Sequence, residues 1–383
     1  MADVASGSSI TDWITAISQL AFLIIFILLF TGANQRFQMY LWGKEIRAGL
    51  AVLQRYVKDA EEKSKDLLAK YGSKRPKTLV ERLKDYVFIS PVDIEPTDII
   101  RRLDHLLETR RAQIKQLLME ELTSVGKVER YKAETSLEIL SALNMIYKIV
   151  RHILLLGEKT NNFLLVMQLR LLLPQIMKIA EGYRKALDDF IKGAPIGDSI
   201  GPQIALHMAG TETPWIHLDD DTVAAKAEYD GRTLILVKAE GPASNVGRPG
   251  VAVEKIVEED IFGTGKPSLI ITVDAALKLE GEDTGSIAEG VGAAIGDPGP
   301  EKIRIERTAS KHKIPLRAVV IKMGMEEAIL TMKKEIYEGG VKAIERLKEI
   351  INEETNPGET ILIAGIGNSI GIGQKLEKTE VTQ

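Results

Sequence analysis

The chain has 383 residues, of which 27% are charged, 5% are aromatic and none is cysteine. This length predicts two or three domains, and the lack of cysteine excludes disulfides, thiolate metal sites, iron–sulfur clusters and cysteine nucleophiles. The net charge of −4 conceals an asymmetry: residues 1–195 hold 29 Lys and Arg against 23 Asp and Glu, whereas residues 196–383 hold 21 against 31. We therefore expect a basic, membrane-proximal half and an acidic distal half.

An uncharged segment near the N-terminus predicts a transmembrane helix over residues 10–31. This segment is long enough to cross a hydrocarbon core of roughly 30 Å. A cleaved signal peptide is the alternative, but the preceding residues lack Lys and Arg and include Asp3. The first basic residues, Arg36 and Lys44, follow the segment, so the positive-inside rule places the tail 1–9 outside the cell. The predicted localisation is the cell membrane, with one span and cytoplasmic C-terminal domains.

Residues 33–192 predict an all-α, membrane-proximal domain. Apolar residues recur at helical spacing from Ile46 to Val57, and Gly72 with Pro76 should end that helix. A short helical segment with Leu79, Leu83 and Val87 should end at a loop enforced by Pro91 and Pro96. Further helices are expected over 98–126, capped by Thr97 or Asp98, and over 137–153. A last helix should open at Thr160 or Asn161. Its apolar stretch 163–173 contains Arg170 and runs into Pro174, which predicts a buried helix of a soluble domain.

The apolar stripes of this half exceed what one small bundle needs, which favours a homo-oligomer. The alternative is a helical bundle that packs only on its own distal domain. The basic clusters lack interleaved aromatic residues, so we expect no nucleic acid partner; the expected lipid contact is the N-terminal helix.

After Lys192 the chain predicts an α/β three-layer domain over residues 193–373, followed by a polar tail, 374–383. Glycine and proline multiply here, and apolar β-branched runs alternate with helical patterns. The expected strands are 233–237, 269–273, 318–322 and 360–364. The expected helices are 201–208, 251–259, 301–312, 326–338 and 340–353.

Three segments of this domain carry candidate site residues. Asp198 precedes a helix that should begin at Gly201-Pro202, and Asp274 ends the strand 269–273, ahead of Asp283-Thr284-Gly285. The last expected strand runs into Gly365-Ile-Gly367-Asn368. Ligands collect at the carboxyl ends of such strands, and glycines let backbone approach a bound group. The alternative interpretation is that Asp274 caps a turn and the glycines only punctuate loops. The Gly-x-Gly lacks the spacing of a dinucleotide fingerprint.

Two chemistries fit a close pair of carboxylates. One pKa of such a pair rises, so the two groups can act as acid and base on a water. Alternatively the pair holds a divalent metal, with His207 as a third ligand. His217 is a weaker candidate, because the adjacent acidic run 219–221 is more typical of a solvated loop. Arg248, in a glycine-rich loop, could bind a phosphate or carboxylate, although a turn-rich connector is equally consistent.

The segments Asp198-x-x-Gly-Pro, Val-Asp274-Ala and Asp283-Thr-Gly followed by Gly-Val-Gly resemble those of the spore germination endopeptidases and, more distantly, of the hydrogenase maturation proteases. The resemblance implies a phosphorylase/maturation-protease-like fold, with Asp198 and Asp274 as catalytic pair or metal ligands. In those families the Gly-x-Gly-Asn strand comes before the first aspartate. Here it is the last strand, which suggests a circular permutation that brings Asn368 to the site. The whole layout also resembles an uncharacterised family of archaeal single-span membrane proteins.

These patterns predict a membrane-anchored cytoplasmic hydrolase, most consistent with a peptidase that acts on a peptide or protein. The alternative is a non-catalytic, membrane-tethered oligomeric scaffold or binding module. A phosphorylase-like or nucleotide-binding site is a third reading of the same fold. Geometry separates the first two: a hydrolase needs the carboxylates of Asp198 and Asp274 close together at a cleft, whereas a scaffold leaves them apart or occupied by backbone caps.

Overall fold

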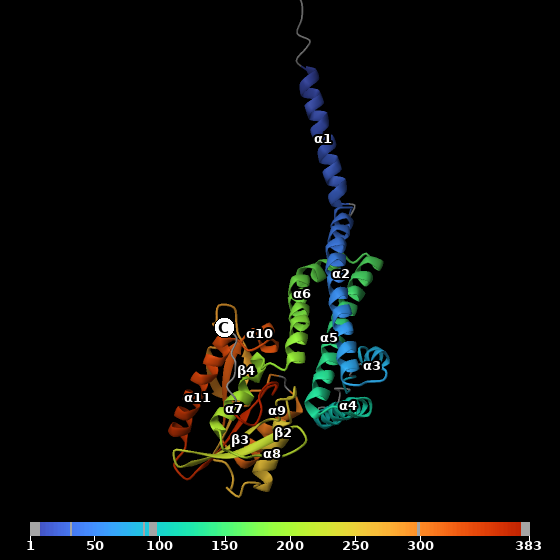
Figure 1. The fold of residues 1–383 in the computed structure, drawn as a ribbon. Coiled ribbons are helices and arrows are strands. Elements are labelled where there is room, and N and C mark those ends of the chain that lie inside the picture. The colour runs from blue at the N-terminus through green and yellow to red at the C-terminus, as the bar shows by residue number, and fades with distance from the viewer. Residues whose placement is uncertain (1–7, 31–32, 87–88, 92–97, 297–298, 377–383) are drawn as a thin grey trace, which may run out of the picture. The chain divides into compact units, whose positions relative to one another are not determined.

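The computed structural model describes residues 8–30, 33–86, 89–91, 98–296 and 299–376 (Figure 1). It divides into two compact units, and each is considered by itself. The first contains residues 1–57 and 144–180, and the second contains residues 58–143 and 181–383. The helical half of the chain therefore contributes to both units rather than forming one compact body.

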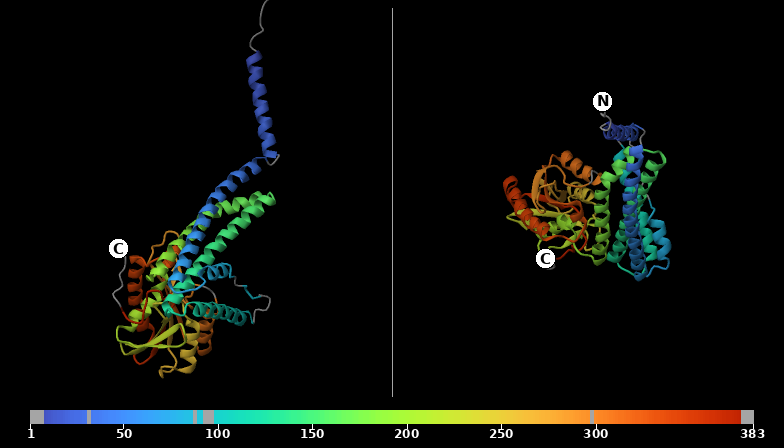
Figure 2. Two further views of the ribbon diagram at one scale, coloured as in Figure 1. Left: turned by 45° about the vertical axis from the view of Figure 1, so that its right-hand side comes forward. Right: turned by 90° about the horizontal axis from the view of Figure 1, so that it is seen from above.

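Four helices build the first unit: α1 (Ser8–Phe30), the start of α2 (Ala33–Lys70), the end of α5 (Lys127–Lys159) and the start of α6 (Phe163–Lys192). The last three lie side by side (Figure 2). The rings of Trp42 on α2 and Phe163 on α6 are 5.0 Å apart. Asn162 caps α6 by accepting Leu165 N–H at 3.1 Å, one residue after the expected start.

The prediction of a short buried helix over 163–173 was wrong. α6 continues through Pro174 to Lys192, and Leu171 and Leu172 on it are 65% and 53% exposed. By length and composition alone, α5 and α6 are each apolar enough to cross a membrane, whereas the searched residues of α1 give a shorter apolar helix, Trp13–Leu23. The predicted span 10–31 coincides with α1 as far as the described residues reach, and the membrane assignment stays a prediction.

The second unit holds the remaining helical segments and the α/β domain. Its helical part comprises the end of α2, α3 (Pro76–Leu83), α4 (Ile99–Glu121) and the start of α5. Gly72, with φ +86°, ends α2 as expected. Asp98 occupies the N-cap position of α4 without a side-chain capping bond, and Thr97 lies outside the described residues. The predicted helical half, followed by an α/β domain, is confirmed.

A mixed sheet organises the α/β domain. In the described residues its order is β1-β2-β3-β7-β4-β6-β5, with seven strands. β3, β7, β4 and β6 are parallel, and β1, β2 and β5 are added antiparallel at the two edges. The chain's last strand therefore lies in the middle of the sheet. The strands are β1 (Trp215–His217), β2 (Thr222–Tyr229), β3 (Arg232–Ala239), β4 (Leu269–Leu277), β5 (Ile287–Val291), β6 (Leu316–Met323) and β7 (Thr360–Gly365).

Helices cover both faces of this sheet (Figure 1). On one face, α7 (Ile200–Ala209) and α11 (Lys334–Glu354) bury Ile204 and Leu347 against β3, β4, β6 and β7. On the other, α8 (Pro249–Glu259) and α9 (Pro300–His312) bury Val253 and Ile305. Two short helices, η1 (Gly197–Ser199) and α10 (Met325–Ile329), complete the domain. Successive side chains of the central strands point to opposite faces and are buried on both, as in β7, where all six residues are buried, so the helices and the sheet form three layers.

One expected helix boundary was wrong. The sequence suggested a break at Gly339-Gly340, but α11 runs through both, and the interruption lies at residues 330–333 instead. A Cβ on Gly339 would lie 2.4 Å from Gly285 O, and one on Gly340 would lie 2.4 Å from Ile200 Cδ1. These glycines therefore permit close packing within a continuous helix.

Candidate functional site

The carboxyl edge of the sheet brings the three singled-out segments together. β7 lies between β3 and β4, and Ile366 N–H, just after β7, donates to Val273 O at 2.8 Å. Two residues later, Asn368 N–H donates to Asp198 Oδ2 at 2.8 Å. Asp198 therefore lies against the loop that follows the last strand, and Asp274 follows Val273 directly. The expected approach of Asn368 to Asp198 is confirmed.

Two glycines permit this convergence. A Cβ on Gly201 would lie 2.0 Å from Ile366 O, and one on Gly367 would lie 2.1 Å from Asp198 O. Gly367 also has φ +124°, a conformation that residues with a side chain rarely adopt. Gly365 is equally constrained, because its Cβ would lie 2.3 Å from Gly201 O. In the structure these glycines let backbone approach backbone, and their expected role in ligand binding stays a prediction.

Asp274 is a buried carboxyl group whose pKa is affected by Asp198. Asp274 is 4% exposed and accepts Ala275 N–H at 2.7 Å. Burial, followed by the negative charge of Asp198, raises the pKa of Asp274 to about 8, against the smaller opposing effect of the Ala275 and Gly296 N–H groups. Burial also raises the pKa of Asp198, and the Asn368 N–H lowers it. At neutral pH the pair therefore holds at least one proton.

This protonation gives the pair two different chemical capacities. Protonated Asp274 can donate a proton, and Asp198 can accept one in the state in which it is ionised. Within the described chain neither carboxylate forms an ion pair with Lys or Arg, so no salt bridge fixes both in the charged state. Such a pair of perturbed acids at the carboxyl edge of parallel strands is a functional-site candidate.

A cavity of about 630 Å³ is lined in part by Asn368, whose backbone N–H contacts Asp198; Asp198 and Asp274 themselves are not among its lining residues. This volume lies within the usual range for small-molecule or side-chain pockets. Asn368 connects the two places: its backbone N–H contacts Asp198, whereas its side-chain Nδ2 donates to Ser244 Oγ at 3.2 Å in the cavity wall. Thr135 Oγ1 of α5 donates to the same hydroxyl at 3.0 Å. The cavity is otherwise lined by α4, α5 and α6 and by segments that include Val246, Gly247, Arg248, Ile295, Pro300 and Glu301.

Arg248 lies in this wall but is engaged by protein carboxylates. Its guanidinium nitrogens lie 3.4 Å from Asp104 and from Glu108 on α4, and 3.7 Å from Glu301. Glu301 in turn accepts Gly250 N–H at 2.6 Å at the start of α8. Arg248 thus ties α4 to α8 and α9. Its predicted role as a fork donor to a bound phosphate or carboxylate would require exchange of these partners.

The α5 side of the cavity is acidic. Burial, followed by the charge of Glu138, raises the pKa of Glu134 to about 7. Burial likewise raises the pKa of Glu138, whose carboxylate lies 3.7 Å from Arg110. The charge of the cavity therefore changes around neutral pH.

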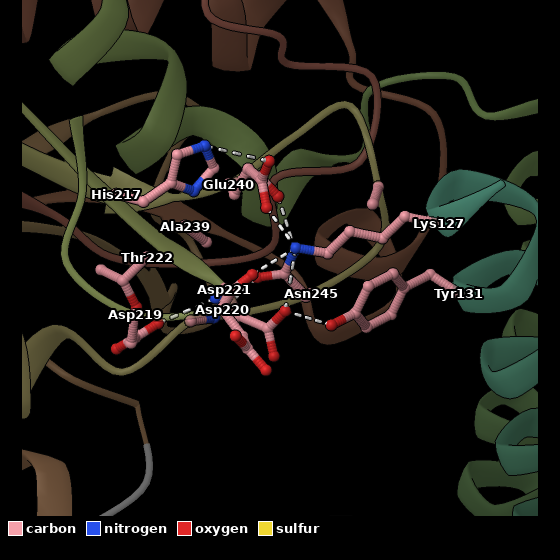
Figure 3. Close-up of polar contacts among 12 residues, drawn as sticks. Lys127, Tyr131, His217, Asp219, Asp220, Asp221, Thr222, Ala239, Glu240 and Asn245 are labelled. Atoms are coloured by element: carbon pink, nitrogen blue, oxygen red, sulfur yellow. Dashed lines mark hydrogen bonds and ion pairs between the residues drawn. The ribbon is translucent and has the colours of Figure 1, made fainter. Parts of the chain in front are cut away.

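A polar cluster joins α5 to the strands beside the cavity (Figure 3). Lys127 Nζ pairs with Glu240 and lies 3.4 Å from Asp221 Oδ1, while the Tyr131 hydroxyl donates to the same Asp221 oxygen. His217 lies 3.8 Å from Glu240. Asp221 is only 6% exposed, so the prediction that the whole run 219–221 is a solvated loop was wrong at this residue.

The predicted third metal ligand does not join the pair. His207 lies near the end of α7, where its Nδ1 pairs with Gln203 O at 2.8 Å and its ring packs edge-on against Tyr337. Among the described residues, no three His, Asp or Glu side chains gather as a metal site would require. The residues present thus offer a divalent ion only the two carboxylates, and metal binding stays a prediction.

Asp283 and Gly285 belong to a loop that is linked through Glu327 to the segment carrying Asp198. Gly285 N–H donates to Lys322 O at 2.8 Å, and Thr284 Oγ1 donates to Glu327 Oε2 at 2.9 Å. A Cβ on Gly197, the residue before Asp198, would lie 2.3 Å from Glu327 O. The loop 283–285 therefore supports the segment that carries Asp198.

Sequence reasoning missed the residues that α4 and α5 bring to the cavity. Glu134, Thr135 and Tyr131 lie on one face of α5, but their spacing is that of an ordinary solvated helix face. The signal in the sequence is the acidic run 219–221, which in the structure pairs with Lys115 of α4 and Lys127 of α5. Charge alone does not select these two lysines from the others in the chain.

The chain was compared with known proteins. Residues 20–193 match the family model described as "Protein of unknown function (DUF1512) N-terminal domain", and residues 196–373 match "Domain of unknown function (DUF1512) C-terminal". No curated protein and no solved structure matches the chain. The resemblance to germination endopeptidases and hydrogenase maturation proteases therefore stays a prediction. Because the two models together cover most of its length, the chain belongs to the DUF1512 family.

Proposed function

We propose that the chain is a peptidase-like hydrolase whose acid–base pair is Asp198 and Asp274. One observation carries this proposal: two buried carboxyl groups with raised pKa values, one of them raised further by the charge of the other, lie at the carboxyl edge of the sheet, and Asn368 connects Asp198 to the cavity. The resemblance to germination endopeptidases supports the same two residues, and a fold like that of those enzymes or of the phosphorylases belongs to this proposal.

In the proposed reaction, Asp198 accepts a proton from a water as the water oxygen attacks the peptide carbonyl carbon. Protonated Asp274 gives its proton to the leaving nitrogen, so a C–O bond forms while the C–N bond breaks. Asp198 has then gained the proton that Asp274 lost, and transfer between them restores the pair. The cavity would hold the side chain next to the cleaved bond. A divalent ion on the two carboxylates would instead supply charge stabilisation and activate the water.

We further propose that the hydrolase is held at the cell membrane by residues 10–31, with residues 33–383 in the cytoplasm and with a homo-oligomer formed through the helical half. The basic residues that follow the apolar segment support this orientation.

The alternative, a non-catalytic membrane-tethered scaffold, rests on a separate observation. Asp198 and Asp274 both accept backbone N–H groups, from Asn368 and Ala275 respectively. These two hydrogen bonds would be sufficient if the only role of the carboxyl groups were to hold the backbone at this edge of the sheet.

Peptide hydrolysis by the full chain in detergent or vesicles separates the two. Asp198→Asn and Asp274→Asn should each lower turnover of a peptide library by about 100-fold or more, as loss of a general acid or base does. Asp230→Asn, at a carboxylate whose side chain is 67% exposed, is the matched control and should not change turnover. Equal turnover by all variants would favour the scaffold. Inhibition by a chelator, reversed by a divalent ion, would identify the metal-assisted form.

A further inference from the structure

The first unit has a small core of its own. α2, α5 and α6 bury Ile46, Leu154 and Val166. Ion pairs tie the helices together on the outside, with Arg47 2.6 Å from Glu158 and Arg170 2.8 Å from Glu45. The three helices thus satisfy their packing without the residues that point away from this core.

Those outward residues include large apolar side chains at helical spacing. On α6, Leu164 and Leu171 are seven residues apart and are 61% and 65% exposed. On α5, Met145, Ile149 and Leu156 form a second exposed stripe. α2 adds a third, made by Phe37, Tyr40 and Leu41. A single exposed leucine needs no explanation, but stripes on three packed helices form a surface that usually has a partner.

The charge of the same segments indicates what that partner is. Residues 34–57 and 144–180 carry nine Lys and Arg but only Glu45 and Glu158 as acidic residues. A second copy that packed on these same segments would bring the same positive charge to the interface, and like charges repel, so the proposed homo-oligomer would form through the other segments of the helical half. An anionic bilayer surface offers both complementary charge and an apolar layer beneath it.

The cations also limit the depth of insertion. Segment 144–159 is about 24 Å long at 1.5 Å per residue, and it contains Lys148 and Arg151. The remaining residues of α5 and α6 belong to the other compact unit. Helices of this kind lie at the interface, with their apolar stripes in the outer acyl region and long basic side chains reaching the headgroups.

We propose that α2, α5 and α6 of the first unit form a membrane-docking surface that binds anionic lipid, in addition to any attachment through α1. This surface is defined by residues 34–57, 144–159 and 163–180. It does not depend on the proposed hydrolase activity. Its consequence is that the first unit itself lies against the bilayer.

The absence of cysteine makes the test direct. Leu171→Cys in the full chain is spin-labelled and reconstituted into vesicles of phosphatidylcholine with about one third phosphatidylglycerol, or of phosphatidylcholine alone. Docking predicts that the label collides often with oxygen and rarely with a water-soluble nickel chelate, and only in the anionic vesicles. A label at Glu353→Cys, whose side chain is 58% exposed on α11, should remain accessible to nickel in both.

A variant with two reversed charges on α5 tests whether the surface binds through the charge of anionic lipid. Arg151→Glu with Lys159→Glu should return the label at residue 171 to water while the chain stays with the vesicle fraction. A nickel-accessible label in anionic vesicles without these changes would overturn the proposal. A label shielded from both reagents, with dipolar broadening that depends on protein density, would assign the surface to a second copy instead.

Discussion

Replacing Asp274 by Asn should stabilise the fold at neutral and mildly alkaline pH. In the folded chain the pKa of Asp274 is about 8 instead of the ordinary 3.8. Between these values the folded state keeps a proton that the unfolded state has released. Stability is therefore complete below about pH 4 and falls as the pH rises to about 8.

The size of the effect follows from the pKa shift. Each pKa unit corresponds to about 1.36 kcal/mol, so the shift from 3.8 to about 8 sets an upper bound of about 6 kcal/mol. Buried sites respond with an effective dielectric constant well above that of a dry interior, and we expect a third to a half of this bound, about 2–3 kcal/mol. Asn has the shape of the protonated acid, and its Oδ1 can still accept Ala275 N–H.

Thermal unfolding of Asp274→Asn and of the unchanged chain at pH 5 and pH 8 measures this effect. At pH 8 the variant should unfold about 5–10 °C higher, the shift that 2–3 kcal/mol gives a domain of this size, and at pH 5, which is closer to the ordinary pKa of 3.8, the difference should fall to about one third of this value. Asp66→Asn, at an exposed carboxylate on α2, should not reproduce the pattern. If Asp274→Asn unfolds no higher at pH 8, then Asp274 is not a buried protonated acid, and the proposed acid–base pair loses its physical basis.

Two further substitutions test the framework of the site. Gly201→Ala places a methyl group 2.0 Å from Ile366 O, so we expect a loss of about 3 kcal/mol in the free energy of unfolding, measured with denaturant. Gly290→Ala is the control and should be nearly neutral, because a Cβ there meets nothing within 4 Å. Equal effects of the two substitutions would contradict the close approach of Gly201 to Ile366. Tyr131→Phe removes the hydroxyl that donates to the buried Asp221 and should cost about 2 kcal/mol. Tyr337→Phe, whose ring packs on His207, serves as its control, and an unchanged midpoint for Tyr131→Phe would show that Asp221 does not need this donor.

The central strands were predictable because they are buried on both faces. The runs within β3, β4, β6 and β7 are apolar and β-branched, and all four were located from sequence. The missed strands are β1, β2 and β5. β2 includes Ala224, Ala225 and Ala227, residues with little strand preference, and β5 contains Gly290. Pairing with a neighbour, rather than local preference, decides such edge strands.

The position of β7 could not follow from local pattern. Strand order depends on contacts between residues far apart in the chain, and Thr233 of β3 pairs with Thr360 of β7 across more than a hundred residues. Only the resemblance suggested that the Gly-x-Gly-Asn strand would lie beside Asp198. The cavity was equally hidden, because Thr135 and Ser244 meet only through the tertiary fold.

The energetics of Asp274 bear on the choice between hydrolase and scaffold. A residue needed only to accept Ala275 N–H within β4 could be Asn or Ser, which carry no charge and lose nothing as the pH rises. Asp at this buried position instead lowers stability at the pH where the chain must stay folded, and Asp198 raises that cost through its own charge. Destabilising groups of this kind accumulate where chemistry requires them. The loss of stability expected for Asp274 therefore favours the hydrolase, whereas the hydrogen bonds of the two carboxylates fit the hydrolase and the scaffold equally.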